Sequence, residues 1–140
     1  MPPKAAITGR CYCGATRITA NQRPRTVVYC HCADCRRWTG APVGAFAAFG
    51  PGDVTLTPPP APLTAVKGVD RWSCPTCGSP LAAQFDYLPD QTYVPVGILD
   101  QAESLAPELH CHADSRLPWL TLTDGLHQAP ASARSTLNTP

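Results

Sequence analysis

The sequence predicts a mainly β protein with a single domain and little helix. Its 140 residues include 17 prolines and only 15% are charged, so helix breakers are common and helix formers are few. Many short apolar or alternating runs, mostly bounded by Gly, Pro, Asn or Asp, are typical of short strands. Seven of the eight cysteines also form three tight groups, which indicates metal sites that would hold such strands together.

The expected strands follow one another along the chain. They cover residues 7–10, 15–20, 26–29, 43–49, 54–57, 63–66, 81–85, 93–98, 109–111 and 119–122. One short helical turn is expected over residues 33–40, ending at Gly40, because glycine commonly follows the last residue of a helix. Residues 129–140 are mostly Ala, Ser, Thr and Pro, so we predict a domain over 1–128 and a flexible tail over 129–140.

Charge and composition limit the expected partners. The formal net charge is +1, and the eleven Lys and Arg residues are scattered along the chain, so we expect binding to neither nucleic acid nor a membrane surface. The sequence opens without the apolar core of a signal peptide and has no apolar run long enough to span a membrane. We therefore expect a cytoplasmic protein, with a secreted domain stapled by disulfides as the alternative interpretation of the cysteines.

The cysteine spacing predicts two metal sites of different kinds. Structural zinc takes four closed ligands, which a CxC pair and a distant CxxC pair can supply together, whereas the remaining three cysteines leave the fourth position of a catalytic zinc open to water or substrate. The alternative is two structural sites, with His31 or another group completing the second. The four-cysteine group is Cys11, Cys13, Cys74 and Cys77, and the three-cysteine group is Cys30, Cys32 and Cys35.

The ordered set of motifs resembles the glutathione-dependent formaldehyde-activating enzyme family. The motifs are GRCYCG at 9–14, YCHCADC at 29–35, CPTCGSPL at 74–81 and a late Pro-Trp at 118–119. The resemblance implies a β-tent of short antiparallel sheets held by the four-cysteine zinc, with a second, catalytic zinc on Cys30, Cys32 and Cys35. It also implies a carbon–sulfur lyase that uses glutathione as substrate or co-substrate and forms or cleaves S-hydroxymethylglutathione from the thiol and formaldehyde.

A thiol substrate also suits the chemistry of three thiolate ligands. A zinc ion with three thiolates carries a formal charge of −1, so it acidifies water less well than a zinc ion with neutral ligands, and a soft thiolate is a better fourth ligand. The competing class is a non-enzymatic zinc module, similar in fold to tent-shaped chaperones or regulators of small GTPases. Such a module does not need the third cysteine group, which favours the enzyme.

Further residues near these motifs are candidates for binding glutathione. Arg36 and Arg37 could hold its two carboxylates and Trp38 could form a wall of the cleft, although the arginines could equally be solvated while Trp38 packs in the core. His110 is a candidate acid or base. If residues 109–112 form a strand, His110 and His112 share one face, and Cys111 lies on the other as a buried thiol.

Overall fold

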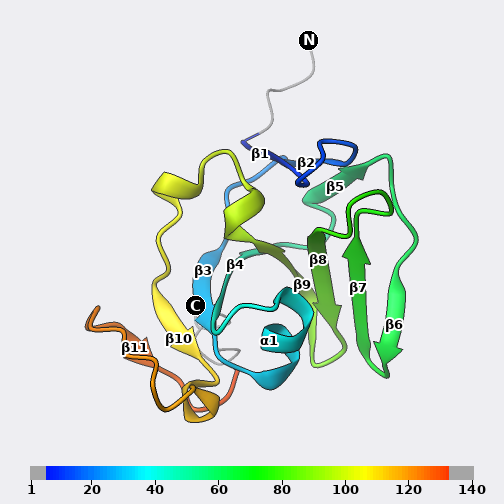
Figure 1. Ribbon diagram of the computed structural model, residues 1–140. Helices are drawn as coiled ribbons and strands as arrows, with labels where there is room; N and C mark the ends of the chain where they lie inside the picture. The colour runs from blue at the N-terminus through cyan, green and yellow to red at the C-terminus, as the bar shows by residue number, and fades with distance from the viewer. Residues whose placement is uncertain (1–5, 133–140) are drawn as a thin grey trace.

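The computed structural model describes residues 6–132 and consists mainly of strands in two sheets (Figure 1). The smaller sheet has the order β1-β2-β5 and is antiparallel. The larger sheet has the order β11-β10-β3-β4-β9-β8-β7-β6. The strands are β1 (Ile7–Arg10), β2 (Arg17–Ala20), β3 (Thr26–Cys30), β4 (Gly44–Phe49), β5 (Val54–Thr57), β6 (Leu63–Val66), β7 (Val69–Ser73), β8 (Pro80–Phe85), β9 (Leu88–Pro95), β10 (Leu109–Cys111) and β11 (His127–Gln128). The mainly β fold predicted from the sequence is confirmed.

Within the larger sheet, β10 forms parallel pairs that bring late residues of the chain beside the early strand β3. From β3 to β6 the neighbouring strands are antiparallel, whereas β10 runs parallel to both β3 and β11. In the pair of β10 and β3, His110 lies opposite Tyr29, and Cys111 lies opposite Cys30. Residues 110–112, the HCH segment, thereby lie beside the start of the three-cysteine group.

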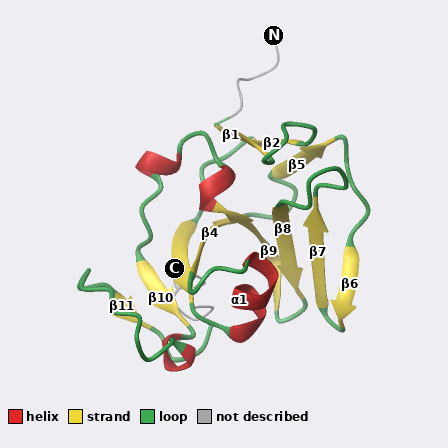
Figure 2. Ribbon diagram, in the orientation of Figure 1, coloured by secondary structure: helices red, strands yellow, loops and turns green. Residues whose placement is uncertain are grey.

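The helix α1 (Ala33–Thr39) follows β3 directly and lies over one face of the larger sheet, where it contacts β4 (Figure 2). Cys32 caps its first turn, because the Cys32 sulfur accepts a hydrogen bond from the Cys35 N–H. Gly40 ends the helix in the left-handed conformation, as the sequence predicts. Three short 3-10 segments cover Val96–Ile98, Ala102–Ser104 and Ala113–Ser115.

The larger sheet is buried on both faces because residues along its central strands alternate between two cores. Along β4, Ala47 and Phe49 join one core with residues of the smaller sheet, and Phe46 and Ala48 join the other. The four-cysteine group contributes Cys11 and Cys74 to the first core. The three-cysteine group contributes to the second, so the two groups lie in different cores.

Three details of the strand prediction differ from the structure. Residues 119–122 form no strand, and Trp119 is 68% exposed in a turn closed by the Leu120 N–H and the Leu117 carbonyl. The expected strand at 93–98 starts earlier, as β9, and gives way to a 3-10 turn after Pro95. The strands β7 and β11 were not predicted, because VDRWS neither alternates nor contains an apolar run and β11 has only two residues.

The start of the predicted tail is attached to the domain. The Ala129 N–H donates to the His110 carbonyl, and the His112 N–H donates to the Ala131 carbonyl. Residues 133–140, the rest of that tail, lie outside the described residues. Within residues 6–132 no helix has the length and apolar character needed to cross a membrane.

Candidate metal centres and an adjoining pocket

The four-cysteine group brings two distant turns together around one point. The four sulfur atoms of Cys11, Cys13, Cys74 and Cys77 all lie within 4.8 Å of one another. The sulfur of Cys13 is 3.6 Å from that of Cys11 and 3.8 Å from that of Cys74. A metal ion bound tetrahedrally by thiolates at 2.3 Å places its sulfurs about 3.8 Å apart. The group therefore has the shape of a closed four-sulfur metal site.

The two turns of this group have the same construction. The Cys11 N–H donates to the carbonyl five residues later in the first turn, and the Cys74 N–H does so in the second. Gly14 and Gly78 follow the two cysteine pairs with φ of 81° and 79°, a conformation that glycine adopts without steric cost. Backbone N–H groups also point at the sulfurs, with Thr16 N 3.3 Å from Cys11 Sγ. Such donors stabilise thiolate ligands.

Hydrogen bonds set the acidity of the thiols in the four-cysteine group. The Ser79 hydroxyl, 3.2 Å from Cys77 Sγ, and the Ser79 N–H lower the pKa of Cys77 to about 5. The side chain of Thr16 lowers the pKa of Cys74 to about 7. The Ala15 N–H favours the Cys13 thiolate, but burial and the neighbouring sulfurs raise the pKa of Cys13 to about 11. Four close sulfurs cannot all be ionised unless a cation shares the site, which is the condition that a metal ion meets.

The three-cysteine group lies where β3 passes into α1. Cys30 ends β3, Cys32 caps the helix, and Cys35 is in its first turn, so a tight turn presents the three sulfurs together. All three sulfurs lie within 4.8 Å of one another, and those of Cys30 and Cys32 are 3.4 Å apart. Among the described residues no fourth His, Cys, Asp or Glu belongs to this group. The geometry could hold a metal ion with one position left open.

The thiols of the three-cysteine group differ in acidity because they hydrogen-bond to one another. Hydrogen bonds from the thiols of Cys30 and Cys35 lower the pKa of Cys32 to about 2. The same contact with Cys32 and burial raise the pKa of Cys30. Ionisation of all three thiols thus needs a bound cation, as it does in the four-cysteine group.

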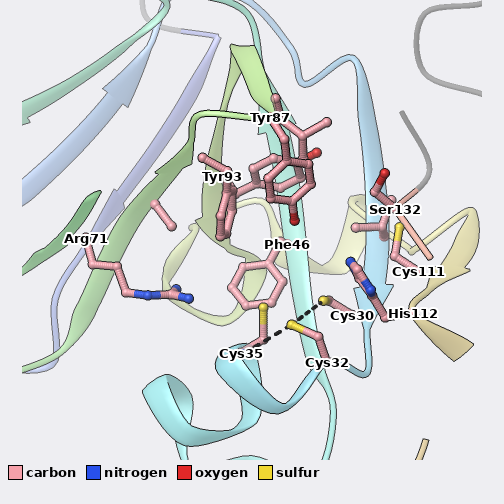
Figure 3. Close-up of a pocket in the computed structure, with 14 residues that line it drawn as sticks. Cys30, Cys32, Cys35, Phe46, Arg71, Tyr87, Tyr93, Cys111, His112 and Ser132 are labelled. Atoms are coloured by element: carbon pink, nitrogen blue, oxygen red, sulfur yellow. Dashed lines mark hydrogen bonds between the residues drawn. The ribbon is translucent and has the colours of Figure 1, made fainter. Parts of the chain in front are cut away.

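The open side of the three-cysteine group faces a pocket. Its cavity volume is about 40 Å³, and its walls come from β3, β4, β7, β8, β9, β10 and α1. Figure 3 shows the three sulfurs on one side, Tyr87 and Tyr93 on the opposite side, and Arg71 and His112 on the two flanks. A space of this size admits a small group of atoms and is too small for a whole tripeptide.

Two predicted contact residues lie on the helix outside this pocket. Arg36 is half-buried and Arg37 is exposed, and neither is among the residues that line it. Trp38 packs parallel to Phe46 at a centroid distance of 6.3 Å and supports the wall from behind. The arginine that does line the pocket is Arg71 of β7, which sequence reasoning missed because no local motif marks it. The prediction that Arg36, Arg37 and Trp38 contact glutathione stays a prediction.

His31 points away from the pocket and joins a buried chain of hydrogen bonds. Its Nε2 lies 2.8 Å from Nδ1 of His110, and Nε2 of His110 lies 2.8 Å from a carboxylate oxygen of Asp124. Both rings are fully buried, and the ring of His110 stacks on Tyr29. Burial lowers the pKa of His31. His31 is therefore not among the ligands of the three-cysteine group, and His110 reaches that group only through His31.

Residues 110–112 differ from the expected arrangement at His112 alone, because His110 and Cys111 lie on opposite sides of β10 as expected. Cys111 and His112 both line the pocket, whereas His110 lies on the other side of β10. The alternation ends because β10 stops at Cys111 and His112 takes the left-handed conformation, with φ of 53°. Cys111 is a buried thiol, as predicted, although it lies in the wall of the pocket and outside the group of three sulfurs.

Comparisons with known proteins agree with this architecture. A crystal structure of a Rhodobacter sphaeroides protein superimposes with a TM-score of 0.55 at 22% identity, covering 87% of this chain and 98% of that one, and so shares its fold. None of the curated proteins matches the chain. The family model described as glutathione-dependent formaldehyde-activating enzyme matches residues 6–115, a span that holds both cysteine groups and nearly the whole pocket wall. By that match, the chain belongs to the glutathione-dependent formaldehyde-activating enzyme family.

Proposed function

We propose that the protein is a zinc-dependent carbon–sulfur lyase that acts on adducts of glutathione or a related thiol with an aldehyde. The observation that carries this proposal is the three-cysteine group, which opens onto a pocket and has no fourth protein ligand among the described residues. Zinc suits both groups, because all ligands are thiolates and the four-cysteine group has tetrahedral spacing. The family model is described as glutathione-dependent, so we take the thiol of glutathione as the ligand that would complete the second site.

The residues divide the work between the two sites. Cys11, Cys13, Cys74 and Cys77 would hold a structural zinc that joins the loop between β1 and β2 to the loop between β7 and β8. Cys30, Cys32 and Cys35 would hold the catalytic zinc, which lowers the pKa of a bound thiol and fixes its sulfur. The reducing cytoplasm would keep these thiols available.

The size of the pocket fits the reacting end of a hemithioacetal. That end consists of a sulfur, a carbon and an oxygen, a group small enough to enter a cavity of about 40 Å³. Tyr87 and Tyr93 close the side opposite the sulfurs and Phe46 lies next to Cys35, so the three rings limit the water around the reacting atoms (Figure 3). The rest of the tripeptide would lie outside the opening, where the exposed Arg37 is one available partner for a carboxylate.

The test is calorimetric titration of glutathione and S-methylglutathione into zinc-loaded protein, together with turnover of S-hydroxymethylglutathione. Glutathione should bind more tightly, because methylation removes the anionic sulfur. Cys32→Ser should lose the second zinc and turnover while the fold is kept, whereas Cys111→Ser, a change at a pocket thiol outside the group, should keep both ions. Equal affinity for the two peptides, with no turnover, would favour the non-enzymatic zinc module instead.

A further inference from the structure

Arg71 is held in one position at the wall of the pocket. Its guanidinium carbon lies 4.5 Å from the ring centroid of Trp38 and 5.5 Å from that of Phe85, so the charged plane lies between two aromatic side chains. Cation–π contacts of this kind fix a long side chain and lower the cost of removing its charge from water. Figure 3 shows the guanidinium extending from β7 toward the side of the pocket where Phe46 and Cys35 lie.

This guanidinium lacks an acidic partner within residues 6–132. The ion pairs there join Arg25 to Asp90 and His110 to Asp124, and neither involves Arg71. The adjacent Asp70 points to the other face of β7, where its carboxylate accepts a hydrogen bond from Thr64. Nη1 of Arg71 is buried and makes no hydrogen bond in the structure. A buried donor without an acceptor costs stability, so its retention beside a pocket indicates that a ligand supplies the acceptor.

The reaction proposed above creates such an acceptor. The thiolate sulfur attacks the carbonyl carbon, a carbon–sulfur bond forms, and the electron pair of the C=O π bond moves to the oxygen, which then takes a proton from water. In the reverse direction the hydroxyl loses its proton to water, the C=O bond re-forms, and the thiolate leaves. In both directions the reaction passes through a tetrahedral alkoxide whose oxygen carries the negative charge, and a fixed donor stabilises this alkoxide and the transition state that connects it to the carbonyl.

We propose that Arg71 is a catalytic residue that donates a hydrogen bond from Nη1 to the oxygen of the aldehyde or hemithioacetal. This inference rests on the proposed function. Arg71 and the three sulfurs line the same small cavity, so a substrate held at the sulfurs would lie near the guanidinium. The aromatic pair keeps the donor in place before the reaction, so little reorganisation is needed when the charge develops.

A different role for Arg71 would be to balance the negative charge of the three sulfurs. Its positive charge favours the Cys35 thiolate, so the two groups are close enough to interact. A residue that only balanced charge would support zinc and thiolate binding in the ground state. An oxyanion donor instead affects the turnover of bound substrate and leaves the binding of glutathione, which has no reacting oxygen, nearly unchanged.

The experiment compares Arg71→Ala and Arg71→Lys with Arg17→Ala, a change at an exposed arginine on the smaller sheet. Each zinc-loaded protein is assayed for zinc content, thermal unfolding, glutathione affinity and turnover of S-hydroxymethylglutathione. We expect Arg71→Ala to lower kcat about 100-fold or more, with glutathione affinity close to that of the wild type. Added guanidinium ion should restore part of this activity saturably, because it fits the space between the two rings. Arg71→Lys covers the case in which Arg71→Ala does not fold, since it keeps the charge but not the planar donor.

The outcomes separate the two ideas. If the wild type turns over the adduct and both Arg71 variants do so equally well, the role of Arg71 is wrong and the proposed function stands. If the variants lose zinc or glutathione affinity in proportion to turnover, Arg71 balances charge and is not the donor. If the wild type itself does not turn over the adduct, the proposed function fails, and the inference fails with it.

Discussion

His31 Nε2 lies 2.8 Å from His110 Nδ1, and this contact joins the loop of the three-cysteine group to the C-terminal part of the domain. Since the carboxylate of Asp124 can only accept, Nε2 of a neutral His110 donates to it, and Nδ1 of His110 must accept. Nε2 of His31 is then the donor, which fixes the tautomer and the orientation of the ring between Cys30 and Cys32. The hydrogen bonds that link His31, His110 and Asp124 therefore position the backbone of the loop that carries the three-cysteine group.

Replacement of His110 should destabilise the fold measurably. In His110→Phe an aromatic ring can still stack on Tyr29, but the donor of His31 loses its acceptor in a buried place. The expected cost is about 1–3 kcal/mol, measured by denaturant unfolding of the metal-loaded protein. The matched control is His127→Phe at an exposed position, which should cost far less. An equal loss of stability in the two variants would mean that the buried hydrogen bonds of His110 make no specific contribution.

The pH dependence of the stability of Asp124→Asn tests the charge carried by these three hydrogen-bonded residues. The Leu126 N–H, 3.0 Å from the carboxylate, and the contact with His110 hold the pKa of Asp124 below its ordinary value of 3.8. A lowered folded pKa contributes stability that is fully present above the unfolded value and is lost as the pH falls through the folded pKa. The stability difference between wild type and variant should therefore be constant from pH 8 to pH 5. A difference that grew below pH 7 would show that the histidines carry a proton.

The sequence predicted what local spacing determines. Cysteines two or three residues apart share a turn, so their spacing indicated each close set, and Gly40 marked the end of α1. The two turns of the four-cysteine group, which are 61 residues apart at Cys13 and Cys74, meet only through the fold. The strand prediction for residues 119–122 was wrong. It rested on an apolar run after a proline, but the ring of Trp119 in that run is exposed. Composition alone does not distinguish these cases.

Contacts across the sheet lay beyond the sequence. Arg71 enters the pocket only because β7 pairs with β8 in a register that places Arg71 opposite Ala83. His110 meets His31, 79 residues away, only because β10 runs parallel to β3. Neither pairing leaves a mark at the residues themselves, since strand order is set by the packing of the whole domain.

The two metal sites should lose their ions in sequence. The three-cysteine group has an open position and faces a cavity, whereas the four-cysteine group is closed and contributes to the core that joins the two sheets. A mild chelator should therefore remove one zinc per chain first, with unchanged far-UV circular dichroism. The second zinc should leave only with unfolding, since structural zinc supplies about 10 kcal/mol or more of folding free energy. Simultaneous loss of both ions with the fold would contradict the difference between the sites.

Ser79 should strengthen the four-cysteine site although it is not a ligand. Its hydroxyl lies 3.2 Å from Cys77 Sγ and accepts a hydrogen bond from the Tyr12 N–H at 2.9 Å, so it links the two turns that carry the four sulfurs. Removal of the hydroxyl in Ser79→Ala withdraws the largest contribution to the lowered pKa of Cys77 and makes its thiolate less stable. The expected loss of metal affinity is about 10–100-fold, measured by competition with a chromophoric chelator. Ser79→Thr keeps the hydroxyl and should recover most of the affinity, and Ser104→Ala, at an exposed hydroxyl in a 3-10 turn, should leave it unchanged. If Ser79→Ala binds zinc at the four-cysteine site as tightly as the wild type, the backbone N–H groups alone stabilise the thiolates. The hydroxyl then serves only to join the two turns.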